Sequence, residues 1–173
     1  GVTRLDGVTG SGKAEVYLEA AAAVLRRDKA AQIAILIPEI ALTPQLGARF
    51  RARFGDLVAI FHSGLTPVER REQWEKVARG QAKVGLGARS ALFLPCARIG
   101  VIIVDEEHES SFKQDEAPRY HARDLAVVRG RQDSAVVILG SATPSLESWN
   151  NAVAGRYRTL RLTRRVLDRP LPE

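Results

Sequence analysis

Residues 7–14 read GVTGSGKA and match the phosphate-binding pattern G-x-x-x-x-G-K-S/T at every position except the last. Such a loop needs backbone N–H groups aimed at phosphate oxygens, glycines where a side chain would block the phosphate, and a lysine that reaches the β and γ phosphates. Lys13 supplies that charge, whereas Ala14 replaces the hydroxyl that would hold Mg²⁺. From the loop alone, an ordinary glycine-rich turn remains an alternative. The predicted nucleotide-binding residues are Gly7, Val8, Thr9, Gly10, Ser11, Gly12, Lys13 and Ala14.

A pair of carboxylates follows an apolar run in the second half of the chain. The segment IIVDEEHESS brings Asp105 and Glu106 to the end of that run. Aspartate is suited to hold Mg²⁺ through its water shell, and the adjacent glutamate can orient and deprotonate the water that attacks a γ-phosphate. Two solvated loop acids would explain the pair alone, but it lies about 90 residues after the loop, as expected when several βα units intervene. Lys13, Asp105 and Glu106 are therefore the predicted catalytic residues, with Asp105 as the Mg²⁺ residue.

Short apolar runs rich in β-branched residues predict strands that carry these side chains. The runs cover residues 32–38, 57–62, 82–87, 99–106 and 134–143, and a short strand remnant, TRLD, precedes the loop. Because their hydrophobicity is continuous rather than alternating, we expect strands buried on both faces, as in a parallel sheet. The carboxyl ends of such strands form the edge at which ligands bind.

Segments with helical spacing alternate with the strands. They cover residues 13–28, 43–55, 66–80, 120–132 and 143–155. Three of them open with Thr-Pro and end at a glycine, and there we expect the threonine to cap the helix. Trp74 and Trp149 lie on these helical patterns and are predicted to belong to the core. The alternation predicts an α/β fold, an open and mainly parallel sheet with right-handed crossovers.

Composition narrows the class of protein. The 173 residues, 45% of them hydrophobic, are enough for one domain with a sizeable core. The single cysteine, Cys96, excludes an internal disulfide and a cysteine-based zinc site. With no signal-like segment or long apolar span, we expect a cytoplasmic setting and no membrane partner. The sequence contains no Met, not even an initiator, so we expect a piece of a larger protein.

The formal net charge is +6, and most of the excess lies near the C-terminus. From residue 155 onward there are six arginines against Asp168 and Glu173, which leaves about +2 for the rest. A nucleic-acid contact and a solvated terminal segment fit this run equally well. We therefore expect one domain over residues 1–155 and a basic C-terminal extension over residues 156–173.

Six segments occur together in the order found in the primosomal protein N′ family. They are GVTGSGKAEVYLEA, LIPEIALTPQ, FHSGLTPVERREQW, GARSALFLP, VDEEHESSFKQDEAPRYHARDLAVVRG and LGSATPSLESWNNAVAGRY. Essentially the whole chain resembles the first RecA-like motor lobe of these replication-restart helicases of the superfamily 2 DExH type. The resemblance implies a P-loop NTPase fold with helices on both faces of the sheet. It also implies the ATP-binding lobe of a 3′-to-5′ DNA helicase that restarts stalled replication forks through primosome assembly.

The same resemblance assigns roles beyond the nucleotide. Residues expected to couple hydrolysis to DNA and to domain closure are His108, Ser141, Ala142 and Thr143. Residues expected to contact DNA are Pro38, Glu39, Thr43, Gln45, His62, Arg89, Ser90, Phe112, Lys113, Arg119 and Tyr120. From the residues alone, the coupling group could simply satisfy buried backbone groups, and the stretch after Pro38 could be only a helix cap. Phe112 and Tyr120 fit stacking on single-stranded bases about as well as they fit a loop pinned onto the core.

The resemblance also sets cofactors and partners. It implies ATP and Mg²⁺, forked or single-stranded DNA, and other primosome and replication-restart proteins that bind through the parent protein. Zinc is expected only in a part of the parent outside this sequence. Because arginines of a second lobe complete such a site, we expect the isolated chain to be nearly inactive. The rival is a degenerate motor lobe kept for DNA binding or scaffolding, which Ala14 and Ala88 favour and the intact Lys13, Asp105 and Glu106 oppose.

Overall fold

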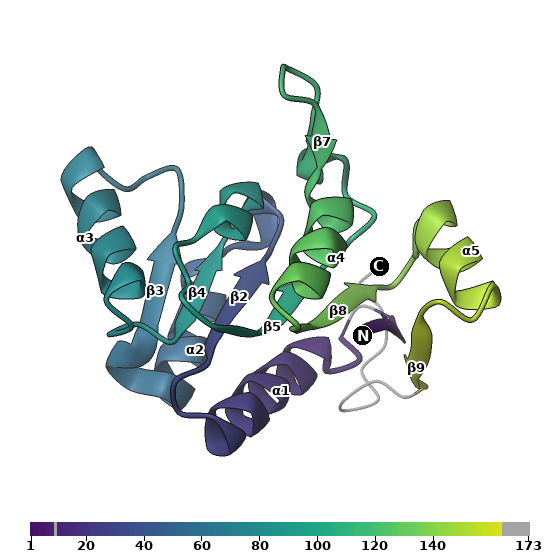
Figure 1. Cartoon of the computed structure of the whole chain (residues 1–173), viewed down its shortest axis with the longest axis horizontal. Coiled ribbons are helices and arrows are strands. Elements are labelled where there is room, and N and C mark those ends of the chain that lie inside the picture. The colour runs from purple at the N-terminus through teal and green to yellow at the C-terminus, as the bar shows by residue number, and fades with distance from the viewer. Residues whose placement is uncertain (9, 164–173) are drawn as a thin grey trace, which may run out of the picture.

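The computed structural model describes residues 1–8 and 10–163 and forms one layered α/β unit (Figure 1). Its main sheet has seven parallel strands in the order β3-β4-β2-β5-β8-β1-β9. These strands are β1 (Val2–Gly7), β2 (Gln32–Leu36), β3 (Val58–Phe61), β4 (Val84–Gly87), β5 (Ile99–Val104), β8 (Val136–Ser141) and β9 (Arg158–Leu162). The predicted open parallel sheet is confirmed.

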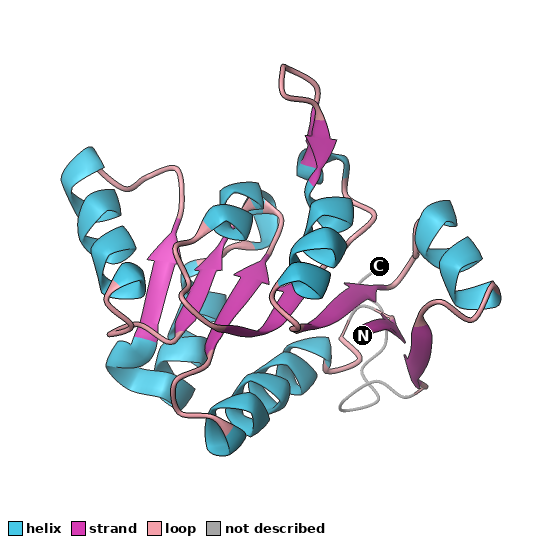
Figure 2. Ribbon diagram, in the orientation of Figure 1, coloured by secondary structure: helices cyan, strands magenta, loops and turns pink. Residues whose placement is uncertain are grey.

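Helices cover both faces of the sheet, as Figure 2 shows. They are α1 (Lys13–Arg27), α2 (Pro44–Phe54), α3 (Pro67–Ala78), α4 (Ala122–Gln132) and α5 (Leu146–Val153). On one face α1 and α2 bury Tyr17, Leu18 and Phe50, while on the other α3 and α4 bury Val77 and Ala126. This burial removes apolar surface from water on both sides of the central strands, which is the main favourable contribution to the fold.

The central strands alternate between these two cores. In β2, Ile33 and Ile35 pack with the α1 and α2 side, whereas Ala34 and Leu36 pack with the α3 and α4 side. All four side chains are at most 1% exposed. Burial on both faces explains why the run reads as continuously hydrophobic rather than alternating.

Two of the three Thr-Pro helix starts behave as predicted. Thr43 Oγ1 accepts a hydrogen bond from Leu46 N at the start of α2, and Thr66 forms a full capping box with Glu69 at the start of α3. The predicted cap at Thr143 is wrong. Ser145 caps α5 instead, accepting from Ser148 N, because the helix begins only at Leu146 and Thr143 still lies in the turn after β8, where its N–H donates to Ser141 Oγ.

Strand β9 corrects the boundary predicted at residue 155. Arg158–Leu162 pairs in parallel with β1 and forms one edge of the sheet, so this segment is not a basic extension. The sequence pattern did not predict this strand because of its arginines, although its Thr159 and Leu162 are half-buried. The sheet therefore runs to Leu162, and residues 164–173 of the predicted extension lie outside the described residues.

The tryptophans are also more exposed than predicted. Trp74 and Trp149 are 41% and 45% exposed, so neither is a core residue. Trp149 packs over the guanidinium of the buried Arg4, whose Cζ lies 4.8 Å from the indole centroid. The hydrophobic periodicity placed these residues on helices correctly but did not decide which face is buried.

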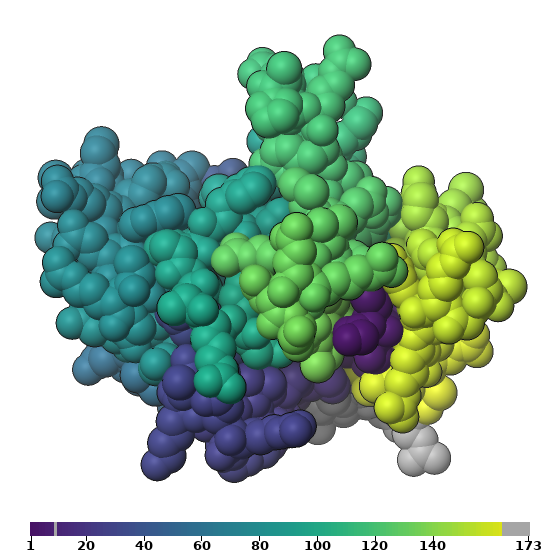
Figure 3. Space-filling model, in the orientation of Figure 1, coloured from purple at the N-terminus to yellow at the C-terminus, as the bar shows by residue number. Residues whose placement is uncertain are grey.

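A two-stranded antiparallel hairpin, β6 (Lys113–Gln114) and β7 (Tyr120–His121), lies outside the main sheet. The space-filling view in Figure 3 shows it standing out from the body of the molecule.

No helix within residues 1–8 and 10–163 has both the length and the apolar character that crossing a membrane requires.

Candidate nucleotide site

The phosphate loop connects the end of β1 to the start of α1. Gly10 and Gly12 have φ angles of 79° and 88°, in the left-handed region that favours glycine. A Cβ on Gly7 would lie 2.4 Å from Ser11 Oγ, so this position also has no room for a side chain. Thr9 lies outside the described residues. The loop has the tight, glycine-dependent geometry that the pattern predicts.

The loop leaves polar groups available to an anion. Among the described residues no side chain caps α1, so the positive end of the helix faces the loop. Ser11 Oγ is buried and has no hydrogen-bond partner in the part of the chain that the structure describes. Beside the loop lies a cavity of about 380 Å³, lined by Val8, Gly10, Ser11, Gly12, Lys13, Ala14, Glu15, Arg49, Asp105 and Glu106. An orphaned hydroxyl, a buried ammonium and an uncapped helix start fit a phosphate group.

Lys13 and the carboxylate pair meet at this cavity. Lys13 is 8% exposed; its Nζ donates to Gly7 O at 2.9 Å and lies 3.2 Å from Glu106 Oε1. Glu106 has a φ of 47°, an unusual conformation for a residue other than glycine, directly after β5. This turn of the backbone brings its carboxylate back to the loop. The structure thus brings together the three predicted catalytic residues at the carboxyl ends of β1 and β5, the two strands that flank β8.

Asp105 is held by a residue that the sequence analysis did not single out. Tyr17 Oη donates to Asp105 Oδ1 at 2.6 Å. Burial and then the neighbouring Asp105 raise the pKa of Tyr17 well above its usual value, so the phenol remains a donor at neutral pH. Burial raises the pKa of Asp105, and the hydrogen bond from Tyr17 opposes that shift.

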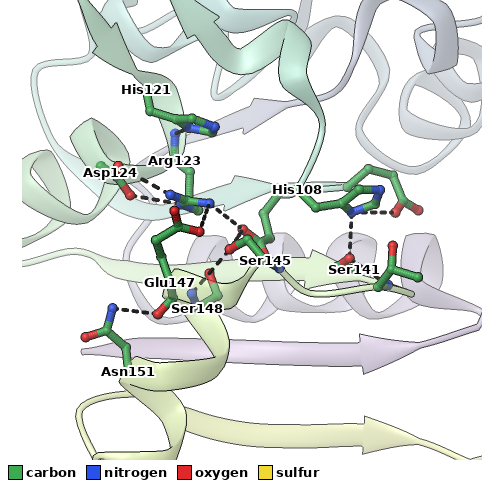
Figure 4. Close-up of polar contacts among 12 residues, drawn as sticks. His108, His121, Arg123, Asp124, Ser141, Ser145, Glu147, Ser148 and Asn151 are labelled. Carbon is green, nitrogen blue, oxygen red and sulfur yellow. Dashed lines mark hydrogen bonds and ion pairs between the residues drawn. The ribbon is translucent and has the colours of Figure 1, made fainter.

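The predicted coupling residues also lie together. His108 Nδ1 is 2.7 Å from Ser141 Oγ, and the same hydroxyl accepts from Thr143 N at 2.9 Å (Figure 4). Ala142 lies between them in the turn that follows β8. Because β8 separates β5 from β1, this contact links the carboxylate segment to the strand beside the phosphate loop.

Glu107 is a functional candidate that the sequence analysis missed. It is 0% exposed, and its carboxylate accepts from both Ser145 N at 2.8 Å and Ser145 Oγ at 3.0 Å. Arg123 Nη1, at the start of α4, lies 3.4 Å from Glu107 Oε2, and Figure 4 shows its guanidinium among these groups. Glu107 therefore ties β5 to the starts of both α4 and α5. Its only sequence signal is its place between Glu106 and His108.

Comparison with known proteins gives the family. The model of the DEAD/DEAH box helicase family matches residues 3–152. This chain belongs to the DEAD/DEAH box helicase family. A helicase of this family has a nucleotide site, and the Lys13, Asp105 and Glu106 cluster lies where the phosphate loop meets the carboxylate segment.

The expected resemblance to replication-restart helicases is confirmed. Replication restart protein PriA of Bacillus subtilis is 51% identical over 98% of this chain and 21% of its own length. The Haemophilus influenzae protein of the same name is 48% identical over 94% of this chain and 22% of its own. The chain spans about a fifth of the length of these relatives.

Solved structures share the fold of this DEAD/DEAH box helicase lobe at low sequence identity. The Hef helicase domain of Pyrococcus furiosus has a TM-score of 0.62 at 18% identity, covering 94% of this chain and 35% of that one. A DEAD box protein from Methanococcus jannaschii has a TM-score of 0.59 at 15% identity, covering 94% and 45%. Both support the RecA-like fold predicted from the sequence.

Five of the residues predicted to contact DNA line one groove of the lobe. Pro38, Glu39, Arg89 and Ser90 border a cavity of about 200 Å³ at the carboxyl ends of β2 and β4. Phe112, also in its lining, is only 1% exposed and belongs to the core, so its predicted role in base stacking is wrong. The alternative of a loop pinned to the core by this side chain is the one observed.

The other predicted contacts are spread around this groove. His62 is exposed, and Glu39 accepts from the neighbouring Ser63 N at 3.2 Å, which brings the end of β3 to the groove. Thr43 and Gln45 are exposed at the start of α2, outside the residues that line the groove. The structure therefore gathers only part of the predicted interface.

The hairpin of the helicase lobe is anchored at its base by Arg89. Its guanidinium donates to Lys113 O and lies 5.9 Å from the ring centroid of Tyr120. Tyr120 also contacts the exposed Phe93 edge to face, at 5.6 Å between centroids. Lys113 and Arg119 stay exposed on the hairpin. Phe93, which the sequence analysis passed over, extends the exposed aromatic surface in place of Phe112.

Proposed function

We propose that this chain is the ATP-binding lobe of a 3′-to-5′ DNA helicase that restarts stalled replication forks in the cytoplasm. One observation carries the proposal: Lys13, Asp105 and Glu106 converge on the cavity beside the phosphate loop. The identity of about half of the chain to proteins named for replication restart supports the biological role. The longer protein would also bind other restart proteins.

Lys13, Asp105 and Glu106 have different roles in phosphoryl transfer. Lys13 and the loop N–H groups bind the phosphates, and nucleotide entry replaces the Lys13–Glu106 ion pair with Lys13–phosphate contacts. Freed of that pair, Glu106 orients the attacking water and accepts its proton. Asp105 would hold Mg²⁺ through water, and the metal supplies charge neutralisation when bound.

DNA binding is assigned to the groove and the hairpin. Arg89 and Ser90 offer donors to backbone phosphates, and the half-buried Tyr120 with the exposed Phe93 offers aromatic faces to unpaired bases. Lys113 and Arg119 add positive charge on the hairpin. Loss of Arg89 should therefore weaken single-strand binding more than nucleotide binding.

A second candidate is a degenerate motor that keeps the lobe for DNA binding or scaffolding. Ala14 favours it, because this position lacks the hydroxyl that ligates Mg²⁺ directly. The intact Lys13–Glu106 contact opposes it, since a decayed site would not be expected to keep both groups paired in the cavity. We propose a weakened metal site rather than a dead one.

Steady-state ATPase activity of the full-length protein tests the proposal. We expect DNA-stimulated hydrolysis that Lys13→Ala abolishes and that Ala14→Thr raises at limiting Mg²⁺. The lobe alone should be nearly inactive, because an arginine from a second lobe is worth about 10³- to 10⁵-fold in such motors. DNA binding without nucleotide hydrolysis by the full-length protein would favour the degenerate motor instead.

A further inference from the structure

Tyr17 lies one helical turn after Lys13, on the same face of α1. Its side chain is 2% exposed, and its hydroxyl donates to Asp105 Oδ1 at 2.6 Å. This length is typical of an O–H group bonded to a carboxylate, which is roughly twice as strong as a bond between neutral groups. A residue of the phosphate-loop helix is thus bonded directly to the predicted magnesium aspartate.

Strand β8 leaves room for this hydroxyl through a glycine. A Cβ on Gly140 would lie 1.7 Å from Tyr17 Oη, a distance that real contacts do not reach. The backbone carbonyl of Gly140 accepts a hydrogen bond from Glu107 N at 3.0 Å. The phenol is therefore enclosed between β8 and the carboxylate segment, and its position is fixed from both sides.

The loop position that carries a hydroxyl in the phosphate-binding pattern is Ala14, three residues before Tyr17. Its methyl group cannot donate to Asp105 or bind a metal. Tyr17 supplies a hydroxyl to Asp105 from the same helix face one turn later. The contact gives the chain a way to orient Asp105 that does not depend on residue 14.

We propose that Tyr17 is a positioning residue for the magnesium site, holding the Asp105 carboxylate in the orientation that receives the metal's water shell. The inference rests on the proposed nucleotide function. Hydrogen-bond partners of metal-binding carboxylates typically change metal affinity by about 10- to 100-fold when they are lost. Tyr17→Phe removes only the hydroxyl and keeps the buried ring, so it isolates this contribution.

Equilibrium binding of a fluorescent ATP analogue to this chain, titrated with Mg²⁺ and repeated in EDTA, tests the inference. For Tyr17→Phe we expect the Mg²⁺ midpoint to rise about tenfold, with nucleotide affinity in EDTA unchanged. Tyr157→Phe is the matched control, because Tyr157 is half-buried and packs with the α3 and α4 core, on the opposite face of the sheet from Tyr17. Gly140→Ala, whose Cβ would displace the phenol and would also lie 3.3 Å from Asp105 Oδ1, should raise the midpoint as well.

A background lacking the carboxylate separates positioning from general packing. In Asp105→Asn, adding Tyr17→Phe should change the Mg²⁺ midpoint no further. An equal loss of affinity in Mg²⁺ and in EDTA, or an unchanged midpoint in Tyr17→Phe, would overturn the positioning role. If Tyr17→Phe does not fold, a Gly140→Ala midpoint equal to that of the unaltered chain would overturn the positioning role. A wild-type chain whose nucleotide binding ignores Mg²⁺ would instead overturn the proposed function and this inference together.

Discussion

Glu107 is a fully buried carboxylate, and replacing it with alanine should strongly destabilise the lobe. The change would leave Ser145 N and Ser145 Oγ without their acceptor and would remove one partner of the buried Arg123. Breaking a buried ion pair costs about 3–5 kcal/mol, and each neutral donor left unsatisfied costs about 1–3 kcal/mol. Because Arg123 keeps Asp124 at 2.9 Å and Ser145 is only half-buried, we expect the low end of both ranges, about 3 kcal/mol for the pair and about 1 kcal/mol for each Ser145 donor, or about 5 kcal/mol in all.

Urea unfolding measures this cost. Trp149 lies on α5, the helix that Ser145 caps, so its fluorescence reports on the affected region. Glu147→Ala is the matched control: it also removes a carboxylate near Arg123, but the Glu147 side chain is 66% exposed. An exposed pair of this kind contributes at most about 1 kcal/mol.

A double-mutant cycle with Arg123→Met sharpens the test. Removing both buried charges should cost clearly less than the sum of the two single changes, because neither charge is then left alone. If Glu107→Ala cost no more than Glu147→Ala, or if the cycle were additive, Glu107 would not be the centre of a buried network.

Three further results are expected from single substitutions or modification. Phe112→Ala should cost about 3–5 kcal/mol of unfolding free energy because the ring is buried in the core. Phe93→Ala, which removes an exposed ring, should cost far less. If Phe112→Ala kept full stability but bound single-stranded DNA more weakly, Phe112 would stack on bases after all. Thr66→Ala should lower the free energy of unfolding by about 1 kcal/mol through loss of the α3 capping box, and an unchanged urea midpoint would contradict the cap. Burial raises the pKa of Cys96 to about 11, so its alkylation at pH 8 should be on the order of 100-fold slower than that of a free thiol; a rate equal to free cysteine would refute its burial.

Local patterns predicted the elements whose side chains face a continuous core. The runs that became β2 and β5 were recognisable because both faces of each strand are buried, and the phosphate loop because its glycines are fixed by backbone geometry. Such features depend on neighbours in sequence. They could therefore be read without knowing the tertiary contacts.

The predictions that failed concern residues whose structure depends on contacts with segments far away in the sequence. Strand β9 is held by pairing with β1, more than 150 residues earlier in the chain, and its arginines read as a charged tail. Burial of Phe112 and the Glu107–Arg123 pair likewise depend on elements that meet only in the folded lobe. Thr143 lies in the turn after β8 with its N–H bonded to Ser141, and the helix begins later, with Ser145 as its cap. None of these contacts leaves a periodic signal in the sequence.

Lys13 is the charged group of the proposed nucleotide site, and equilibrium binding of ATP by Lys13→Ala measures its contribution. Lys29→Ala is the matched control, because Lys29 is exposed beyond the far end of the same helix. We expect Lys13→Ala to weaken ATP binding at least about tenfold through loss of a charged hydrogen bond, while Lys29→Ala binds like the unaltered chain. Equal ATP affinity in all three proteins, or no ATP binding by the unaltered chain at millimolar nucleotide, would show that this loop is not a nucleotide site.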